Sequence, residues 1–190
     1  LLSYHRIHVP EFAVFRAGRP IRRHKHLTFP LIVKSLTQEA SIGISQASVV
    51  DSDEKLKERV QFIHDSIGTA AIVEQYIEGR EIYVGIHGNQ TLQALPVWEL
   101  YFKNMPEGAR RIATDRVKWS VKYQKKYGIE SGPAIDLPEA QAIAAASKPL
   151  QSVSPFAPED VNLVFIRADQ EKIASVASAL KGILGDKAAI

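Results

Sequence analysis

The stretch that decides the fold is IVEQYIEGREIYVGIHGN, residues 72–89. It holds two apolar runs of strand length, residues 71–77 and residues 81–86, with a polar turn at residues 78–80 between them. A Gly-Asn turn signal follows, and residues 91–97 are then expected to form a strand that pairs back. Consecutive strands joined this way predict antiparallel pairs in an α+β or mixed α/β chain.

Upstream of these strands, residues 30–36 (PLIVKSL) are expected to form a short buried strand. A lysine near its end, Lys34, interrupts the otherwise apolar run. Residues 37–48 are rich in small and hydroxyl side chains and are expected to form a loop. A helix is predicted over residues 53–67, because a capping-box pattern precedes it, apolar residues recur at helical spacing and a glycine follows. We expect residues 30–97 to form one sheet with this helix packed on it.

The second half of the chain is less regular. Residues 106–138 are polar and rich in turn-forming residues, and residues 139–147 are expected to form an alanine-rich helix. Two prolines mark residues 152–160 as a linker. A strand over residues 161–166 and an amphipathic helix over residues 170–184 are predicted to follow.

Composition bounds the class of protein. The chain has 190 residues, 45% hydrophobic and 24% charged, as is usual for a globular protein. It has no cysteine, which excludes disulfides, thiolate zinc sites and a cysteine nucleophile. No apolar run approaches the roughly 20 residues of a membrane helix, and the opening does not resemble a signal peptide. We therefore expect a cytoplasmic protein, and the missing initiator methionine suggests that its opening lies inside a longer gene product.

The net charge is only +3, but the basic residues gather in two clusters. The first cluster consists of Arg16, Arg19, Arg22, Arg23 and Lys25. The second consists of Lys118, Lys122, Lys125 and Lys126. Such clusters serve the phosphates of a nucleotide or of a nucleic acid, or are simply solvated surface, and the sequence leaves these interpretations open. Steep salt dependence of DNA or RNA binding would favour a nucleic-acid-binding protein.

Four motifs resemble the D-alanine–D-alanine ligase family of ATP-grasp proteins, in the family's order. Residues 29–45 (FPLIVKSLTQEASIGIS) look like its strand and glycine-containing loop, and residues 72–89 are similar to its adenine- and ribose-binding strands. Residues 95–100 (LPVWEL) resemble the strand that follows. Residues 121–140 (VKYQKKYGIESGPAIDLPEA) look like the later phosphate-side loop and the helix after it. The resemblance implies an ATP-grasp-type antiparallel sheet with packed helices, incomplete in this chain.

The resemblance also implies which residues bind ATP. Lys34 would hold the α- and β-phosphates, and Lys122 would reach phosphate from the later loop, next to a tyrosine, Tyr123, that helps close the site. The lid over the phosphates would be formed by Ser41, Ile42 and Gly43. Glu74 would accept from the adenine amino group, and Glu81 would bind the ribose hydroxyls. The adenine edge would be completed by the backbones of Gln75 and Ile77.

In the chemistry that the family implies, ATP phosphorylates a carboxylate, an amine attacks the acylphosphate, and Mg²⁺ neutralises charge. Two departures stand out. The loop reads Gln38-Glu39-Ala40-Ser41 where the family has Glu-Gly-Ser-Ser, which puts the dipeptide substrate in question. Residues 167–169 (RAD) only faintly echo the family's Arg-x-Asp strand, and no Glu-x-Asn follows. We therefore identify no magnesium ligands, and we expect His24 and His26 to be surface histidines and not a metal site.

Residues 1–28 are expected to be a remnant of a preceding region, residues 29–147 the ATP-grasp nucleotide-binding region, and residues 148–190 a strand-helix segment without family resemblance. The favoured function is the ATP-binding domain of an ATP-dependent carboxylate–amine ligase. The alternative is a non-catalytic nucleotide-binding or interaction module, a truncated or degenerate ATP-grasp fragment. The expected partners are a nucleotide and, once the site is complete, carboxylate and amine substrates, without nucleic acid or membrane. Alone, this chain is expected to bind adenine nucleotide weakly at most and not to ligate.

Overall fold

The chain is represented by a computed structural model, which describes residues 9–87, 93–94, 96–134 and 162–168. The chain divides into two compact units. The first, called the helical unit, consists of Pro10–Tyr76 and Phe102–Ile129. The second, called the strand unit, is built on Ile77–Tyr101 and the described part of Glu130–Ile190.

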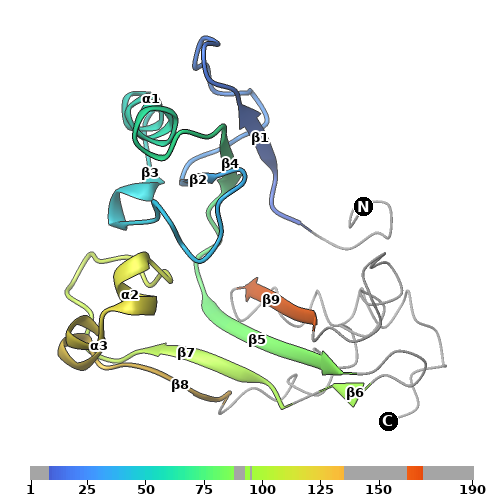
Figure 1. The fold of residues 1–190 in the computed structure, drawn as a ribbon, viewed down its shortest axis with the longest axis vertical. Coiled ribbons are helices and arrows are strands. Elements are labelled where there is room, and N and C mark those ends of the chain that lie inside the picture. The colour runs from blue at the N-terminus through green and yellow to red at the C-terminus, as the bar shows by residue number, and fades with distance from the viewer. Residues whose placement is uncertain (1–8, 88–92, 95, 135–161, 169–190) are drawn as a thin grey trace. The chain divides into compact units, whose positions relative to one another are not determined.

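The helical unit contains a four-stranded sheet in the order β1-β4-β2-β3 (Figure 1). Its strands are β1 (Phe12–Phe15), β2 (Leu31–Ser35), β3 (Val49–Val50) and β4 (Ala71–Gln75). All three pairings are antiparallel. β2 and β4 confirm two of the predicted strands, whereas β1 was not predicted, because four residues give too little alternation to be recognised.

The core of this unit lies between the sheet and helix α1 (Asp53–Phe62). Alternate residues of β2 and β4 are fully buried, as the two-residue period of a strand requires. The helix adds residues at its own spacing, with Leu56 and Val60 buried on the same side. Each large side chain buried in this way contributes about 1.5–3 kcal/mol, so this apolar contact holds helix and sheet together.

Helix α1 begins where the sequence predicts. The hydroxyl of Ser52 accepts a hydrogen bond from the Lys55 amide at 3.3 Å, which caps the helix. After Phe62 the helix widens into one π-helical turn, η2 (Ile63–Ile67), and ends at Gly68 with φ 76°. The predicted helix over residues 53–67 is confirmed, with a change of helical type in its last turn.

Three short helices complete the unit: η1 (Gln46–Ser48), α2 (Asp115–Trp119) and α3 (Val121–Tyr127). The sequence predicted only loop or turn at these places, because helices of three to seven residues are too short to show periodicity. Local caps stabilise α2 and α3. Thr114 accepts from the Val117 amide and Ser120 accepts from the Tyr123 amide.

The strand unit is built around the long strand β5 (Arg80–His87), which pairs with three others (Figure 1). These are β6 (Gln93–Ala94), β7 (Trp98–Phe102) and β9 (Asn162–Ala168), all antiparallel to it. β7 has β8 (Ile129–Pro133) as its other neighbour. The predicted strands at residues 81–86 and 161–166 are confirmed as β5 and β9.

The prediction that residues 30–97 form one sheet is wrong, because β4 and β5 belong to different sheets. After β4 the Tyr76 amide still donates to the Pro30 carbonyl at 2.9 Å, and the chain then leaves the first sheet. Gly79 has φ 153°, a backbone conformation that glycine adopts most readily. Alternation of apolar residues identifies a strand but not its partner.

The predicted helices over residues 139–147 and 170–184, and the linker over residues 152–160, lie outside the described residues. Within the described part of the chain, no helix has the length and apolar character needed to cross a membrane.

We predict that Ser52→Ala lowers the free energy of unfolding by about 1 kcal/mol, because the Lys55 amide loses its cap. The exposed Ser66 offers the control, and Ser66→Ala should change stability by less than about 0.5 kcal/mol. Urea denaturation followed by circular dichroism measures both. Equal effects of the two substitutions would show that the cap does not stabilise the helix.

Candidate functional site

Lys34 and Glu74, two residues predicted to bind ATP, meet on the face of the first sheet away from its core. Lys34 lies at an alternate position of β2, between the buried Val33 and Ser35, and its ammonium group forms an ion pair with the carboxylate of Glu74 on β4. Their side chains are 35% and 22% exposed, respectively. Since both are partly solvated, the pair itself adds little stability. Its significance is that a cation and an acceptor stand side by side on rigid strands.

The predicted lid, Ser41 to Gly43, lies in a strained loop. Ala40 and Ser41 have φ 54° and 65°, the left-handed region that non-glycine residues rarely adopt, and Gly43 has φ 73°. Such a conformation costs a non-glycine residue roughly 1–2 kcal/mol. Gly43 is also closely packed, because a Cβ there would lie 3.1 Å from the Ile67 side chain. Ser41 is buried, whereas Ile42 is 43% exposed.

Hydrogen bonds tie this loop to the segment that leads into α2. The Ser41 hydroxyl donates to the Ala113 carbonyl at 2.6 Å, and the Trp119 indole donates to the Ala40 carbonyl at 3.2 Å. Further along, the side chain of Gln46 exchanges two hydrogen bonds with the backbone of Arg110, at 2.8 and 2.9 Å. The loop and the α2 segment are therefore bound together within the helical unit.

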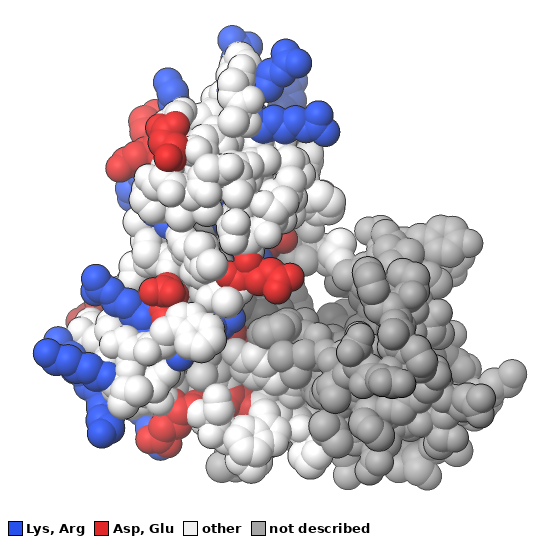
Figure 2. Space-filling view, in the orientation of Figure 1, with Lys and Arg blue, Asp and Glu red and all other residues white. Residues whose placement is uncertain are grey.

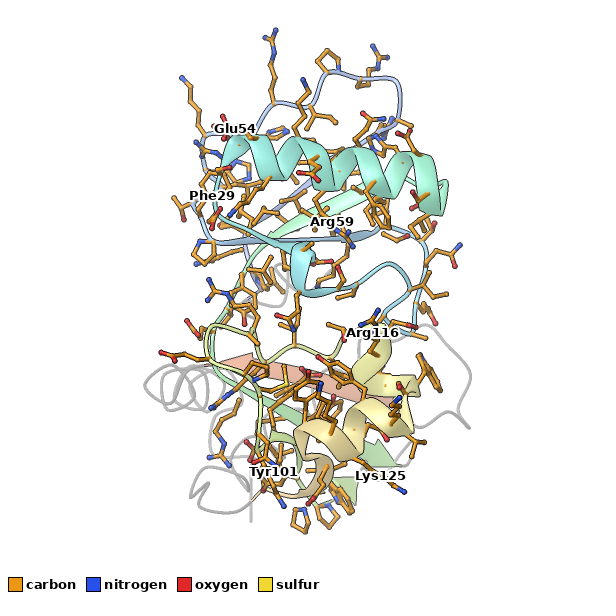
Figure 3. All side chains as sticks on the ribbon, turned by 90° about the vertical axis from the view of Figure 1, so that its left-hand side faces the viewer. Phe29, Glu54, Arg59, Tyr101, Arg116 and Lys125 are labelled. Atoms are coloured by element: carbon orange, nitrogen blue, oxygen red, sulfur yellow. The ribbon has the colours of Figure 1, made fainter. Side chains whose placement is uncertain are left out.

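Arg59 is a residue of this site that the sequence analysis missed. It projects from the buried side of α1, is 9% exposed, and donates through Nη2 to the Gly43 carbonyl (Figure 3). Its guanidinium carbon lies 4.2 Å from the centre of the Phe62 ring. Burial lowers the pKa of the Arg59 guanidinium, and the neighbouring Glu58 partly opposes this. The signal was present, because Arg59 lies three residues after Leu56, within the apolar stripe of the helix.

The residues predicted for the adenine edge are placed at the end of β4 and just beyond it. Gln75 is half-buried, and its backbone amide already donates to the Glu11 carbonyl at 2.8 Å. Only its carbonyl side therefore remains for the predicted adenine contact. Ile77 is half-buried and begins the strand unit.

Glu81, predicted to bind ribose, lies on β5 in the strand unit and is 8% exposed. Its carboxylate accepts a hydrogen bond from the Tyr83 hydroxyl at 2.6 Å, a contact that the sequence did not predict. On the same strand Arg80 pairs with Glu99 of β7 through two hydrogen bonds, one from Nε at 2.8 Å and one from Nη2. The strand unit therefore presents an oriented, buried carboxylate.

Lys122 and Tyr123 lie on α3, not on an open loop. Lys122 is exposed, while the Tyr123 ring contacts the Tyr127 ring with their centres 4.5 Å apart and their planes tilted by 55°. Within the described residues no hydrogen bond joins either residue to the loop of residues 40–44, the glycine loop. Figure 2 shows lysine and arginine on this part of the surface and again at the far end of the helical unit, where the first basic cluster lies.

Within the described residues no group of three or more His, Asp or Glu side chains could hold a metal ion. The rings of His24 and His26 lie 5.7 Å apart, and the His26 ring contacts the Phe12 carbonyl at 3.3 Å. Arg167 is placed on β9, whereas Asp169 lies outside the described residues. A surface pocket of about 410 Å³ is bordered by η1 and α1 and contains none of the predicted ATP-binding residues.

Comparison with known proteins shows the family of the chain. The family model described as D-ala D-ala ligase C-terminus matches residues 1–148. A D-alanine–D-alanine ligase of Desulfotalea psychrophila is 42% identical over 74 residues, which are 39% of this chain and 22% of the relative. An uncharacterized protein, y4sG, of Sinorhizobium fredii is 34% identical over 90 residues, 47% of this chain and 25% of the relative.

A solved structure extends the likeness to most of the fold. The D-alanine–D-alanine ligase from Bacillus anthracis, complexed with ATP, superposes on this chain with a TM-score of 0.58 and 18% sequence identity. The match covers 89% of this chain and 48% of the ligase chain. The chain thus matches a quarter or less of the length of these two curated relatives and about half of the solved ligase. Since the family model spans most of the 190 residues and the mixed α+β architecture is that of an ATP-grasp ligase, the chain belongs to the D-ala D-ala ligase C-terminus family.

Proposed function

We propose that this chain is the ATP-binding domain of an ATP-dependent carboxylate–amine ligase. The observation that carries the proposal is the glycine loop, which is held in a strained conformation by hydrogen bonds from its surroundings. Strained backbone that the surrounding structure fixes is typical of ligand-binding loops. Family membership supplies the class of ligand, a nucleotide, and thereby distinguishes this proposal from other uses of such a loop.

The phosphates would bind Lys34 and the loop. An ammonium group has three donors, so Lys34 can contact phosphate while it stays paired with Glu74. In the loop, Ile42 with negative φ is followed by Gly43 with positive φ, the order found in backbone concavities that bind anions. Within the described residues the amides of Ser41 and Gly43 donate no hydrogen bond. Lys122 would add a further cation from α3.

For the nucleoside, each of the two units offers one carboxylate of its own. Glu81 suits ribose, because it is buried and the Tyr83 hydroxyl orients it. Glu74 retains one oxygen that can accept from the adenine amino group while the other pairs with Lys34. The backbones of Gln75 and Ile77 would complete the adenine edge.

Magnesium does not fit the described residues, because they contain no cluster of carboxylates, and no step is assigned to it. The proposed contribution of this chain is to bind ATP and to orient its phosphates toward a carboxylate acceptor. An amino acid is the proposed class of both substrates, with the cytoplasm as the proposed location. A non-catalytic nucleotide-binding module remains the second candidate, and only an assay of ligation separates the two.

We predict that Lys34→Ala weakens ATP binding by about tenfold or more, because a charged hydrogen bond contributes roughly 1.5–3 kcal/mol. Lys25→Ala should leave the affinity unchanged, since Lys25 is exposed on the turn after β1. Titration calorimetry measures the ATP affinity of both variants. Equal losses would show that Lys34 does not contact phosphate.

We also predict that Glu81→Ala abolishes the preference of the protein for ATP over 2′,3′-dideoxy-ATP. The ribose hydroxyls lose their acceptor, so both nucleotides should bind with the same affinity. Tyr83→Phe keeps the carboxylate and should retain most of the preference, which makes it the matched control. If Glu81→Ala still discriminated between the two nucleotides, another residue would bind the ribose.

A further inference from the structure

Each residue of the glycine loop with positive φ has its own anchor. The Ala40 carbonyl accepts from the Trp119 indole, and the Ser41 hydroxyl donates to the Ala113 carbonyl. The Gly43 carbonyl accepts from Arg59, with the Ser48 hydroxyl at 3.5 Å as a longer contact. A left-handed residue persists only where its surroundings hold it, so these contacts fix the shape of the loop.

The Arg59 anchor differs from the other two. Trp119 is 66% exposed and lies on the five-residue helix α2, whereas Arg59 is almost fully buried and projects from the ten-residue helix α1 (Figure 3). A hydrogen bond from a charged donor is also roughly twice as strong as a neutral one. Gly43 is thus held by a charged donor from α1, a ten-residue helix packed on the core.

Burying this guanidinium has a cost that packing alone does not explain. Its Nε atom has no hydrogen-bond partner among the described residues, and burial disfavours the charged form. The neighbouring positions on the same side of α1, Leu56, Val60 and Ile63, are apolar and fully buried. An apolar side chain at position 59 would avoid the desolvation, but it could not donate to the Gly43 carbonyl.

That hydrogen bond determines where the loop presents its polar groups. A backbone carbonyl near a phosphate repels it, whereas an amide attracts it. Because Arg59 binds the Gly43 carbonyl from the helix side, that oxygen is occupied and directed toward the protein. The amides of Ser41 and Gly43 donate no hydrogen bond within the described residues, so both stay available to a ligand.

We propose that Arg59 is a positioning residue, which orients the glycine loop for phosphate binding by holding the Gly43 carbonyl against helix α1. This rests on the proposed function only in identifying the ligand as ATP. The geometric part, that Arg59 fixes the loop, stands on the contacts of Arg59 alone.

The test compares Arg59→Met, which keeps length and removes the donor, with Arg59→Lys, which keeps a charged donor. Lys57→Met is the matched control, because Lys57 is exposed on the same helix. The first measurement is the hydrogen-exchange rate of the Ile44 amide relative to that of the Val73 amide in the core. The Ile44 amide reports on the loop because it donates to the Ser41 carbonyl at 2.9 Å inside it. Calorimetry measures the affinity for ATP, and ligand-observed NMR measures the affinity for adenosine.

In Arg59→Met we expect the Ile44 amide to exchange at least about tenfold faster relative to Val73, and ATP to bind about tenfold more weakly. Adenosine affinity should stay the same, because adenosine has no phosphate. Arg59→Lys should recover part of both effects, and Lys57→Met should change neither.

Unchanged exchange at Ile44 in Arg59→Met would overturn the proposal, as would equal losses for ATP and adenosine, which indicate general loosening of the fold. If the unaltered chain does not bind ATP, the proposed function fails. The exchange experiment then still decides whether Arg59 holds the loop, so the two failures are distinguishable.

Discussion

The contact between helix α1 and its sheet is the interaction on which the rest of the helical unit depends. The inner residues of β2 and β4 pack against three fully buried side chains, Leu56, Val60 and Ile63. This apolar contact fixes the distance of the helix from the sheet and its rotation about its own axis. Two features of the site follow from it. At this position of the helix the Arg59 side chain donates to the Gly43 carbonyl, and Gly43 packs closely against Ile67, where a Cβ would lie 3.1 Å from that side chain. The apolar core therefore sets the geometry of a polar loop.

The candidate site combines stable and strained parts. Lys34 and Glu74 lie on paired strands, and the register of the sheet places their side chains next to each other. Their positions therefore do not depend on the conformation of a loop. The glycine loop is the opposite case, because its backbone is unfavourable by itself and depends on donors from α1 and α2. Ligand-binding loops that are fixed before the ligand arrives lose less conformational entropy on binding. For the proposed phosphate contact, such an arrangement favours tight and specific binding over adaptability.

The sequence predicted those parts of the fold that local patterns control. Alternation located β2, β4, β5 and β9, and helical spacing with caps located α1. It did not predict β1, α2 or α3, which are too short for a period, nor the division into two sheets, which depends on strand pairing. Among site residues, the resemblance named Lys34 and Glu74 but not their pairing. Arg59 was missed because its partner, Gly43, is sixteen residues away and its side chain interrupts an apolar stripe.

Strand β1 has a consequence for the surface of the sheet. Within the described residues it pairs only with β4 and forms an edge of the sheet, and its side chains Phe12 and Val14 are 50% and 38% exposed. An exposed apolar edge invites pairing with another chain, and nearby positive charge is a common way in which proteins prevent it. The first basic cluster, which begins at Arg16 directly after β1, lies at this end of the unit (Figure 2). Mutual repulsion between these cations would oppose the pairing of two copies of this edge.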